Sequence, residues 1–224
     1  KKLAESLDRL VLDVKFGSGA FMKTREDAEE LAAGLATAGN ENGVRTSVVL
    51  TPMDEPLGRT VGNALEVVEA VETLQNRGPE DLVELTLQLC ASVSERPAEV
   101  YRKHLQSGAA WGKFCALVEA QDGDPRILER PEDFHRAPFI EDLPAFANGV
   151  ITRIDAKAVG LASVLLGAGR TVATESIDYA VGFSGIRKTG ERVTKGEPVL
   201  RIHARTTQGL EMAREALERA VTIE

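Results

Sequence analysis

The stretch LVLDVKFGSGAFM, from Leu10 to Met22, decides the fold of this chain. Its first six residues, Leu10–Lys15, are typical of a buried β-strand, and the glycine turn Gly17–Gly19 follows directly. Glycine has no Cβ and tolerates positive φ, so this turn lets the main chain approach a ligand closely. Ligands of open α/β sheets bind at the carboxyl ends of the strands. The residues expected to organise a cleft at this corner are Asp13, Lys15, Gly17 and Ser18.

An ordinary strand–turn–helix unit without a ligand is the alternative interpretation of this stretch. In either case Asp13 and Lys15 share one face of the strand, because strand side chains alternate. Thr24 has the side chain of an N-cap, and acidic residues follow it where the helix dipole favours them. A second strand is expected at Arg45–Thr51. A strand–helix–strand unit of this length favours a parallel pair with a right-handed crossover.

After residue 51, the chain is predicted to contain a helical part, then a proline-containing linker, and then a part with both strands and helices. After a loop at 52–60, apolar periodicity predicts helices at 63–77, 80–93, 97–106 and 110–121. Prolines punctuate residues 122–148, and this stretch is predicted to be a linker. Beyond it, strands are expected at 149–154, 181–187 and 199–204, with helices at 155–167, where Asp155 is the expected cap, and at 208–220. The predicted class is α/β: part of a mixed or parallel-sheet α/β domain (10–121), then a small α+β domain (149–224).

Composition narrows the class of function. The net charge is −8 and no basic tract is present, so a nucleic-acid partner is disfavoured. No stretch approaches the roughly 18–20 apolar residues that span a bilayer, and the first residues lack the apolar core of a signal peptide. Cys90 and Cys115 have no metal-type spacing and are expected to be free thiols, which favours a cytoplasmic protein. The chain begins without methionine, in what looks like the tail of an amphipathic helix, so we expect a piece of something longer.

The usual catalytic signatures are missing. The sequence has no G-x-S-x-G, H-E-x-x-H or Walker A motif, and GSGAFM is not a dinucleotide fingerprint. His104, His135 and His203 are far apart in sequence and are expected to be surface or packing residues. Residue patterns alone therefore predict a fold but no reaction.

Longer segments carry a resemblance. Residues 1–24 (KKLAESLDRLVLDVKFGSGAFMKT), 50–74 (LTPMDEPLGRTVGNALEVVEAVETL) and 149–160 (GVITRIDAKAVG) closely resemble thymidine phosphorylase and pyrimidine-nucleoside phosphorylase. Residues 181–204 (VGFSGIRKTGERVTKGEPVLRIHA) look like the carboxyl-terminal domain of that family. The resemblance covers almost the whole chain in order.

The resemblance implies phosphorolysis, in which a pyrimidine (deoxy)nucleoside and phosphate give free base and (deoxy)ribose 1-phosphate. It also implies a homodimer whose helical and α/β domains close over the substrates, with residues 1–9 at the end of the helical domain. No organic cofactor is implied, and phosphate is the co-substrate. The family's phosphate-binding loop would lie upstream of this chain, so we expect the chain alone to be inactive.

The resemblance also places individual residues. It implies that Lys1 contacts the pyrimidine carbonyl and that Phe21 lines the base pocket, where an aromatic face can pack on a flat ring. It further implies a monovalent cation, such as potassium, held by the main-chain carbonyls of Leu57 and Thr60 and by Glu69. A core phenylalanine at position 21 and a solvated helix carboxylate at position 69 are the plain alternatives.

Two other functions remain open on the sequence. A related phosphoribosyltransferase shares the architecture, although the segment after residue 148 argues against it. The run GERVTKGEP, at 190–198, looks like the hairpin of lipoyl- and biotin-carrier domains. Neither Lys188 nor Lys195 has the neighbours of a modification motif, so the hairpin is expected to be shared structure rather than a carrier.

Overall fold

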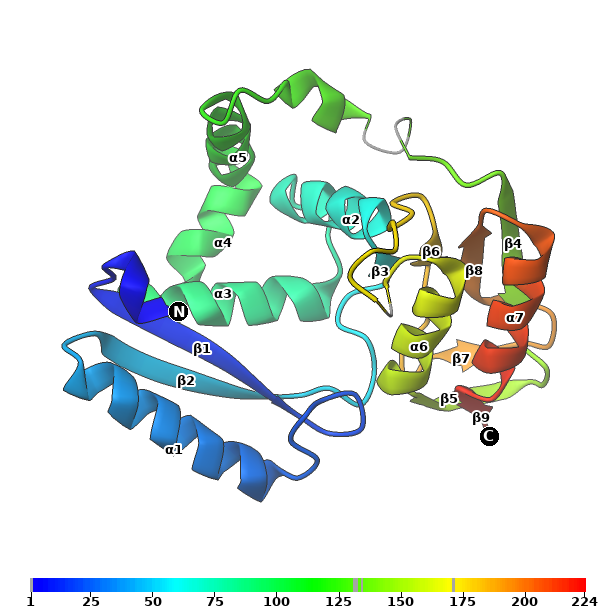
Figure 1. The fold of residues 1–224 in the computed structure, drawn as a ribbon, viewed down its shortest axis with the longest axis horizontal. Helices are drawn as coiled ribbons and strands as arrows, with labels where there is room; N and C mark the ends of the chain where they lie inside the picture. The colour runs from blue at the N-terminus through cyan, green and yellow to red at the C-terminus, as the bar shows by residue number, and fades with distance from the viewer. Residues whose placement is uncertain (1, 131–132, 134, 171) are drawn as a thin grey trace.

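Two long parallel strands carry the first part of the computed structural model, which describes residues 2–130, 133, 135–170 and 172–224. Strand β1 (Arg9–Phe16) pairs with β2 (Arg45–Pro52) in continuous parallel register. Helix α1 (Arg25–Glu41) makes the crossover and lies along one face of the pair (Figure 1). The predicted strand–helix–strand unit with a parallel pair is therefore confirmed.

Helix α1 begins and packs as its residues dictate. The Thr24 hydroxyl caps it by accepting a hydrogen bond from the Asp27 N–H at 3.2 Å. Its inner face presents the buried Ala28 and Ala32, which pack with Val14 of β1. Alanines bring the helix close to the sheet because they add no bulk, so the β1 strand is held firmly where it enters the glycine turn.

A group of helices follows β2, and one of them, α3, lies against the other side of β1 (Figure 1). These helices are α2 (Ala64–Leu74), α3 (Glu80–Ser94), α4 (Ala98–Gln106) and α5 (Ala109–Glu119). Helix α3 contacts β1 and β2, and α4 packs on α3. All four lie within a few residues of the predicted bounds. Cys90 in α3 and Cys115 in α5 are both free thiols, as expected.

The second unit contains two antiparallel sheets and two helices. One sheet has the order β3-β6-β8-β4, and the other has the order β7-β5-β9. Its elements are β3 (Val61–Gly62), β4 (Phe139–Pro144), β5 (Gly149–Ile154), α6 (Ala156–Leu166), β6 (Gly182–Ser184), β7 (Arg192–Val193), β8 (Pro198–Ala204), α7 (Thr207–Glu218) and β9 (Val221–Ile223). Strand β3 comes from the first half of the chain, so the two halves share a sheet.

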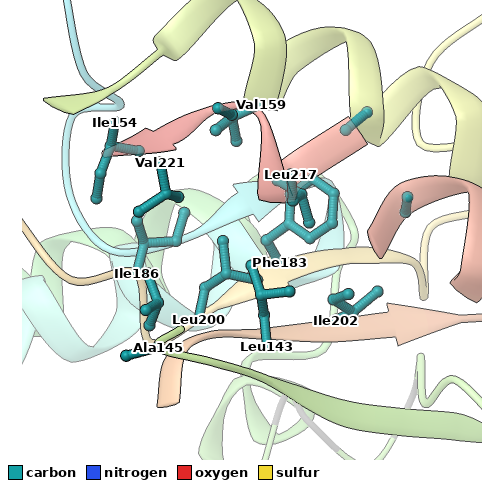
Figure 2. Close-up of a cluster of buried hydrophobic side chains, with 14 of the residues drawn as sticks. Leu143, Ala145, Ile154, Val159, Phe183, Ile186, Leu200, Ile202, Leu217 and Val221 are labelled. Carbon is teal, nitrogen blue, oxygen red and sulfur yellow. The ribbon is translucent and has the colours of Figure 1, made fainter. Parts of the chain in front are cut away.

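The main hydrophobic core lies inside this second unit. Figure 2 shows side chains from α6, α7 and several strands converging on Phe183, which is fully buried. Ile202 and Leu217 pack in the same cluster and are also fully buried. This large core fixes the strands and helices of the second unit, and with them the loops that connect these elements.

Several regions differ from the sequence prediction, among them the short strands β3, β7 and β9, which were not expected. Part of the predicted linker is strand β4, which pairs antiparallel with β8. Only Leu143 and not its neighbours is buried along β4, so apolar alternation could not reveal the strand. At the amino end, Lys2–Glu5 form one turn of 3-10 helix with no buried residue, in place of the tail of an amphipathic α-helix. A further 3-10 turn, Pro125–Glu129, also lies within the predicted linker.

Within the described ranges, no helix combines the length and the apolar character needed to cross a bilayer.

Replacing Phe183 by alanine tests the position of the core. The change removes a fully buried ring, so we expect the free energy of unfolding to fall by about 3–5 kcal/mol in urea denaturation. Phe146 is 56% exposed, and Phe146→Ala is the matched control, with a change within about 0.5 kcal/mol. Equal losses in the two variants would contradict this placement of the core.

Candidate functional site

The carboxyl end of β1 holds a closed network of three polar side chains. The Lys15 ammonium donates to Asp13 Oδ2 at 2.6 Å and to Thr51 Oγ1 at 2.8 Å. The Thr51 hydroxyl in turn donates to Asp13 Oδ1 at 2.5 Å. Thr51 lies opposite Lys15 in the parallel register, which explains why strand β2 supplies the third member. Asp13 is therefore placed to orient Lys15, whereas the part of Thr51 could not be predicted from a local pattern.

The glycine turn after β1 is built around a carboxylate from another loop. Gly17 has a φ of +114°, and a Cβ added there would lie 2.7–2.9 Å from the carboxylate atoms of Asp54. The Ser18 N–H donates to Asp54 Oδ1 at 2.8 Å, so the carboxylate holds the turn from inside. Lys23 holds it from the other side, donating to the carbonyls of Ser18 at 3.0 Å and Ala20 at 2.6 Å.

Asp13 and Lys15 line one hollow, whereas Gly17 and Ser18, which were expected at the same corner, do not line it. A cavity of about 370 Å³ is lined by Asp13, Lys15 and Phe21, among others. The Phe21 ring is 93% exposed, so the alternative of a core phenylalanine does not hold in this structure. Lys1, the other residue expected at the base site, lies outside the described residues. The structure thus brings the strand-end residues and one of the two expected base-pocket residues together.

Glu69 of α2 is the buried centre of the second expected site. Glu69 is only 6% exposed, so the alternative of a solvated carboxylate does not hold. The Arg59 N–H donates to Glu69 Oε1 at 2.7 Å. Gly58 adopts a φ of +69°, and a Cβ there would lie 2.2 Å from Glu69 Oε2. The loop Pro52–Thr60, termed the site loop below, therefore folds closely over the carboxylate.

Burial dominates the electrostatics of this carboxylate. Loss of solvation raises the pKa of Glu69 above 4.5; the Arg59 N–H opposes that rise, and the charge of Asp81 adds to it. The Thr60 hydroxyl lies near enough to Glu69 to favour the ionised form of that carboxylate. Its Oγ1 is buried and makes no hydrogen bond of ordinary geometry within the described residues. A buried carboxylate and an unsatisfied oxygen are features that suit a bound cation.

Any cation here would depend on main-chain oxygens. Across the described parts of the chain, no three His, Cys, Asp or Glu side chains gather in a way that could hold a metal ion. The expected ligand set does not need such a cluster, because it combines the carbonyls of Leu57 and Thr60 with a single carboxylate. Hard monovalent and divalent cations accept such oxygen ligands. The residues present are thus compatible with the expected potassium site.

A larger cavity, of about 740 Å³, adjoins the other side of Thr60 and Glu69. Its second-unit wall carries Ser184 Oγ and His203 Nε2, 2.8 Å apart. Burial, aided by the charge of Arg201, lowers the pKa of His203, which favours the neutral imidazole. This pairing joins β6 to β8, and the spacing of the histidines along the sequence could not predict it.

The sequence of this chain matches two family models and several curated proteins. A family model described as "Glycosyl transferase family, a/b domain" matches residues 1–108, and one described as "Pyrimidine nucleoside phosphorylase C-terminal domain" matches residues 150–224. The pyrimidine-nucleoside phosphorylases of Staphylococcus aureus strains USA300, NCTC 8325 / PS 47 and N315 are 39% identical over 232 aligned residues. Along its whole length, the chain is similar to pyrimidine-nucleoside phosphorylases.

The extent of the match is also informative. The alignment covers 100% of this chain and 53% of each relative, so the chain spans about half the length of the curated relatives it matches. The carboxyl-terminal family model begins within β5, yet β4 already belongs to the sheet of that unit. The structural unit therefore starts earlier in the chain than the matched family segment.

Glu69→Gln tests the cost of the buried carboxylate. The folded-state pKa is raised, so ionisation above about pH 4.5 opposes folding, whereas below that pH the group is protonated in both states. In buffer without potassium, we expect the variant to raise the Tm at pH 7 by about 2–4 °C, an effect that fades towards pH 4. Scanning calorimetry measures this shift.

Glu72→Gln is the matched control, since Glu72 is an exposed carboxylate on the same helix and its loss should leave the Tm unchanged. A Glu69→Gln variant with an unchanged or lowered Tm at pH 7 would show that the carboxylate is stabilising where it lies.

Proposed function

We propose that this chain forms one part of an enzyme that cleaves pyrimidine (deoxy)nucleosides with phosphate, releasing free base and (deoxy)ribose 1-phosphate. The observation that carries the proposal is the 39% identity, along all of the chain, to proteins named pyrimidine-nucleoside phosphorylase. The order of the two matched family segments supports it. The reaction class is pentosyl transfer to phosphate.

In this proposal the strand-end corner receives the base and the sugar. The exposed ring of Phe21 packs on the pyrimidine, and Lys1 donates to the carbonyl oxygen that gains charge as the base leaves. Asp13 fixes the position of the Lys15 ammonium through the 2.6 Å bond between them. Gly17 and Ser18 shape the turn beside the cleft. Rate enhancement comes mainly from alignment of the reactants and from stabilisation of the leaving base.

The site loop is proposed to hold a monovalent cation such as potassium. The carbonyls of Leu57 and Thr60 and the carboxylate of Glu69 are the proposed ligands, and the buried position of Glu69 supports this set. When bound, the cation supplies a fixed positive charge beside the buried carboxylate. The chain's own part is to keep these oxygens oriented and to exclude water from them.

The phosphate site is proposed to be built by residues outside this chain, because residues 1–224 contain no counterpart of the family's glycine- and serine-rich phosphate loop. The homodimer and the cytoplasmic location belong to the same proposal. Free thiols at Cys90 and Cys115 support a reducing compartment.

The position of Lys188 argues against this residue as the attachment point of a carrier hairpin near residue 190. The side chain of Lys188 is only 13% exposed and is paired with Asp81, so it is not available for attachment of a cofactor. The carboxyl-terminal family match likewise favours a nucleoside phosphorylase over a phosphoribosyltransferase.

The first experiment measures release of thymine from thymidine, with and without phosphate, by the chain alone. It is repeated after adding the part of the Staphylococcus aureus enzyme that lies outside the aligned region. We expect no release by the chain alone and phosphate-dependent release by the mixture. A mixture that associates but releases no thymine would contradict the proposed function.

Asp13→Asn tests the cleft-organising role in that active mixture. The change removes the charge that holds Lys15, and we expect kcat to fall about 10-fold or more, the usual scale for a supporting residue. The control is Asp8→Asn, the same change at an exposed residue just before β1, which should keep full activity. Unchanged turnover in Asp13→Asn would remove Asp13 from the mechanism.

A further inference from the structure

The site loop is tied to the second unit by a short segment, Ile186–Glu191, termed the clamp segment here. The Ile186 N–H donates to the carbonyl of Arg59 at 3.0 Å. The Arg59 guanidinium returns a bond to the Ile186 carbonyl at 3.0 Å and another to Glu191 at 2.5 Å. The Thr189 N–H donates to Glu55 Oε2 at 2.9 Å. The two segments therefore exchange bonds along most of their length.

Lys188 makes the contacts at the centre of the clamp segment. Its side chain is largely buried, and its ammonium group lies 2.7 Å from Asp81 Oδ2 and donates to the carbonyl of Pro56. The same Asp81 oxygen accepts the Gly58 N–H at 3.0 Å. Lys188 and Asp81 thus hold the main chain on both sides of Leu57, one at the preceding carbonyl and one at the following N–H.

Lys188 is the cation that compensates the Asp81 carboxylate. Burial raises the pKa of Asp81, but the hydrogen bond and charge of Lys188, together with the N–H groups of Gly58 and Leu82, more than offset this rise, so the pKa is lowered overall. Lys188 also favours the ionised form of Glu69, which Asp81 opposes. The nearby Arg59 is already engaged by Glu191. Removing one partner of a partly buried ion pair leaves the other charge uncompensated, which is costly.

We propose that Lys188 is a positioning residue that sets the main-chain geometry of the site loop through Asp81 and Pro56. The second unit thereby helps to build the proposed cation site, although none of its residues is a ligand of that site. The structural part of this inference stands on the contacts alone. Its consequence for cation binding and turnover rests on the proposed function.

Hydrogen exchange of single amides, followed by NMR, tests the structural part directly in this chain. In Lys188→Met we expect the Gly58 and Arg59 N–H groups to lose protection about 10-fold or more, because their loop is released. Core amides such as that of Ile202 keep their protection if the variant folds. Lys188→Arg keeps the charge and should restore most of the protection. Lys195→Met is the control, since Lys195 is an exposed lysine in the same unit.

A second readout tests the consequence in the active mixture described above. We expect the potassium concentration for half-maximal activity to rise about 10-fold in Lys188→Met, with kcat largely recovered at saturating potassium and with near-normal behaviour in Lys188→Arg. Unchanged protection of Gly58 and Arg59 in Lys188→Met would overturn the inference. So would an unchanged potassium dependence in an active mixture. Absence of phosphorolysis by the unmodified chain in that mixture would instead contradict the proposed function and leave the exchange result to decide the inference.

Discussion

The buried carboxylate of Glu69 is the constraint on which the site depends. Taking an ionised group out of water costs free energy unless donors or a counter-charge compensate it. Here one N–H, from Arg59, reaches the carboxylate, and Gly58 lies so close to the other oxygen that a Cβ there would be only 2.2 Å from it. The site loop therefore has little freedom, because any movement would break that bond or collide with the carboxylate. Such a rigid arrangement suits a site that binds through main-chain oxygens.

That constraint is transmitted to the rest of the molecule by the same loop. At its beginning, Asp54 holds the glycine turn through the Ser18 N–H, and the Asp54 carbonyl accepts the Ala156 N–H of α6 at 2.9 Å. At its end, Arg59 joins the second unit through Glu191. A single loop thus connects the end of β1, helix α2 and the second unit. The two halves of the chain act as one framework around it, in addition to sharing the β3-β6-β8-β4 sheet.

Local features of the fold could be predicted from the sequence, because their causes lie within a few residues. Thr24 and Asp155 were expected as helix caps, and both accept the bond of a cap, Asp155 from the Ala158 N–H at 3.0 Å. The parallel pair followed from the length of its crossover. Strand β4 was missed because its side chains are mostly exposed and its pairing partner lies about sixty residues away. Pairing of that kind depends on tertiary contacts that no local pattern records.

The candidate site was predicted only in part, for a similar reason. Asp13, Lys15 and Phe21 line one cavity at the end of β1, and the sequence could place them near one another because strand and turn geometry are local. The partners that fix the site, such as Asp81 and Lys188, come from elements more than a hundred residues apart. Their residue types are ordinary surface types, so nothing in the sequence distinguished them from solvated charges. The burial of Glu69 could not be predicted either, because the loop that covers it contributes backbone rather than side chains.

Glycine is the residue type through which the sequence does record this arrangement. Gly17 and Gly58 both have positive φ, and each lies against a carboxylate from elsewhere, Asp54 in one case and Glu69 in the other. A side chain at either position would be strained and would also displace the acidic group. The two glycines therefore serve the same purpose at two corners of the site: each leaves room for an acid that accepts N–H bonds from the following residue. At Gly17 and Gly58, glycine thus marks where the main chain closes around an acidic group, although the glycine does not identify the residue that carries the charge.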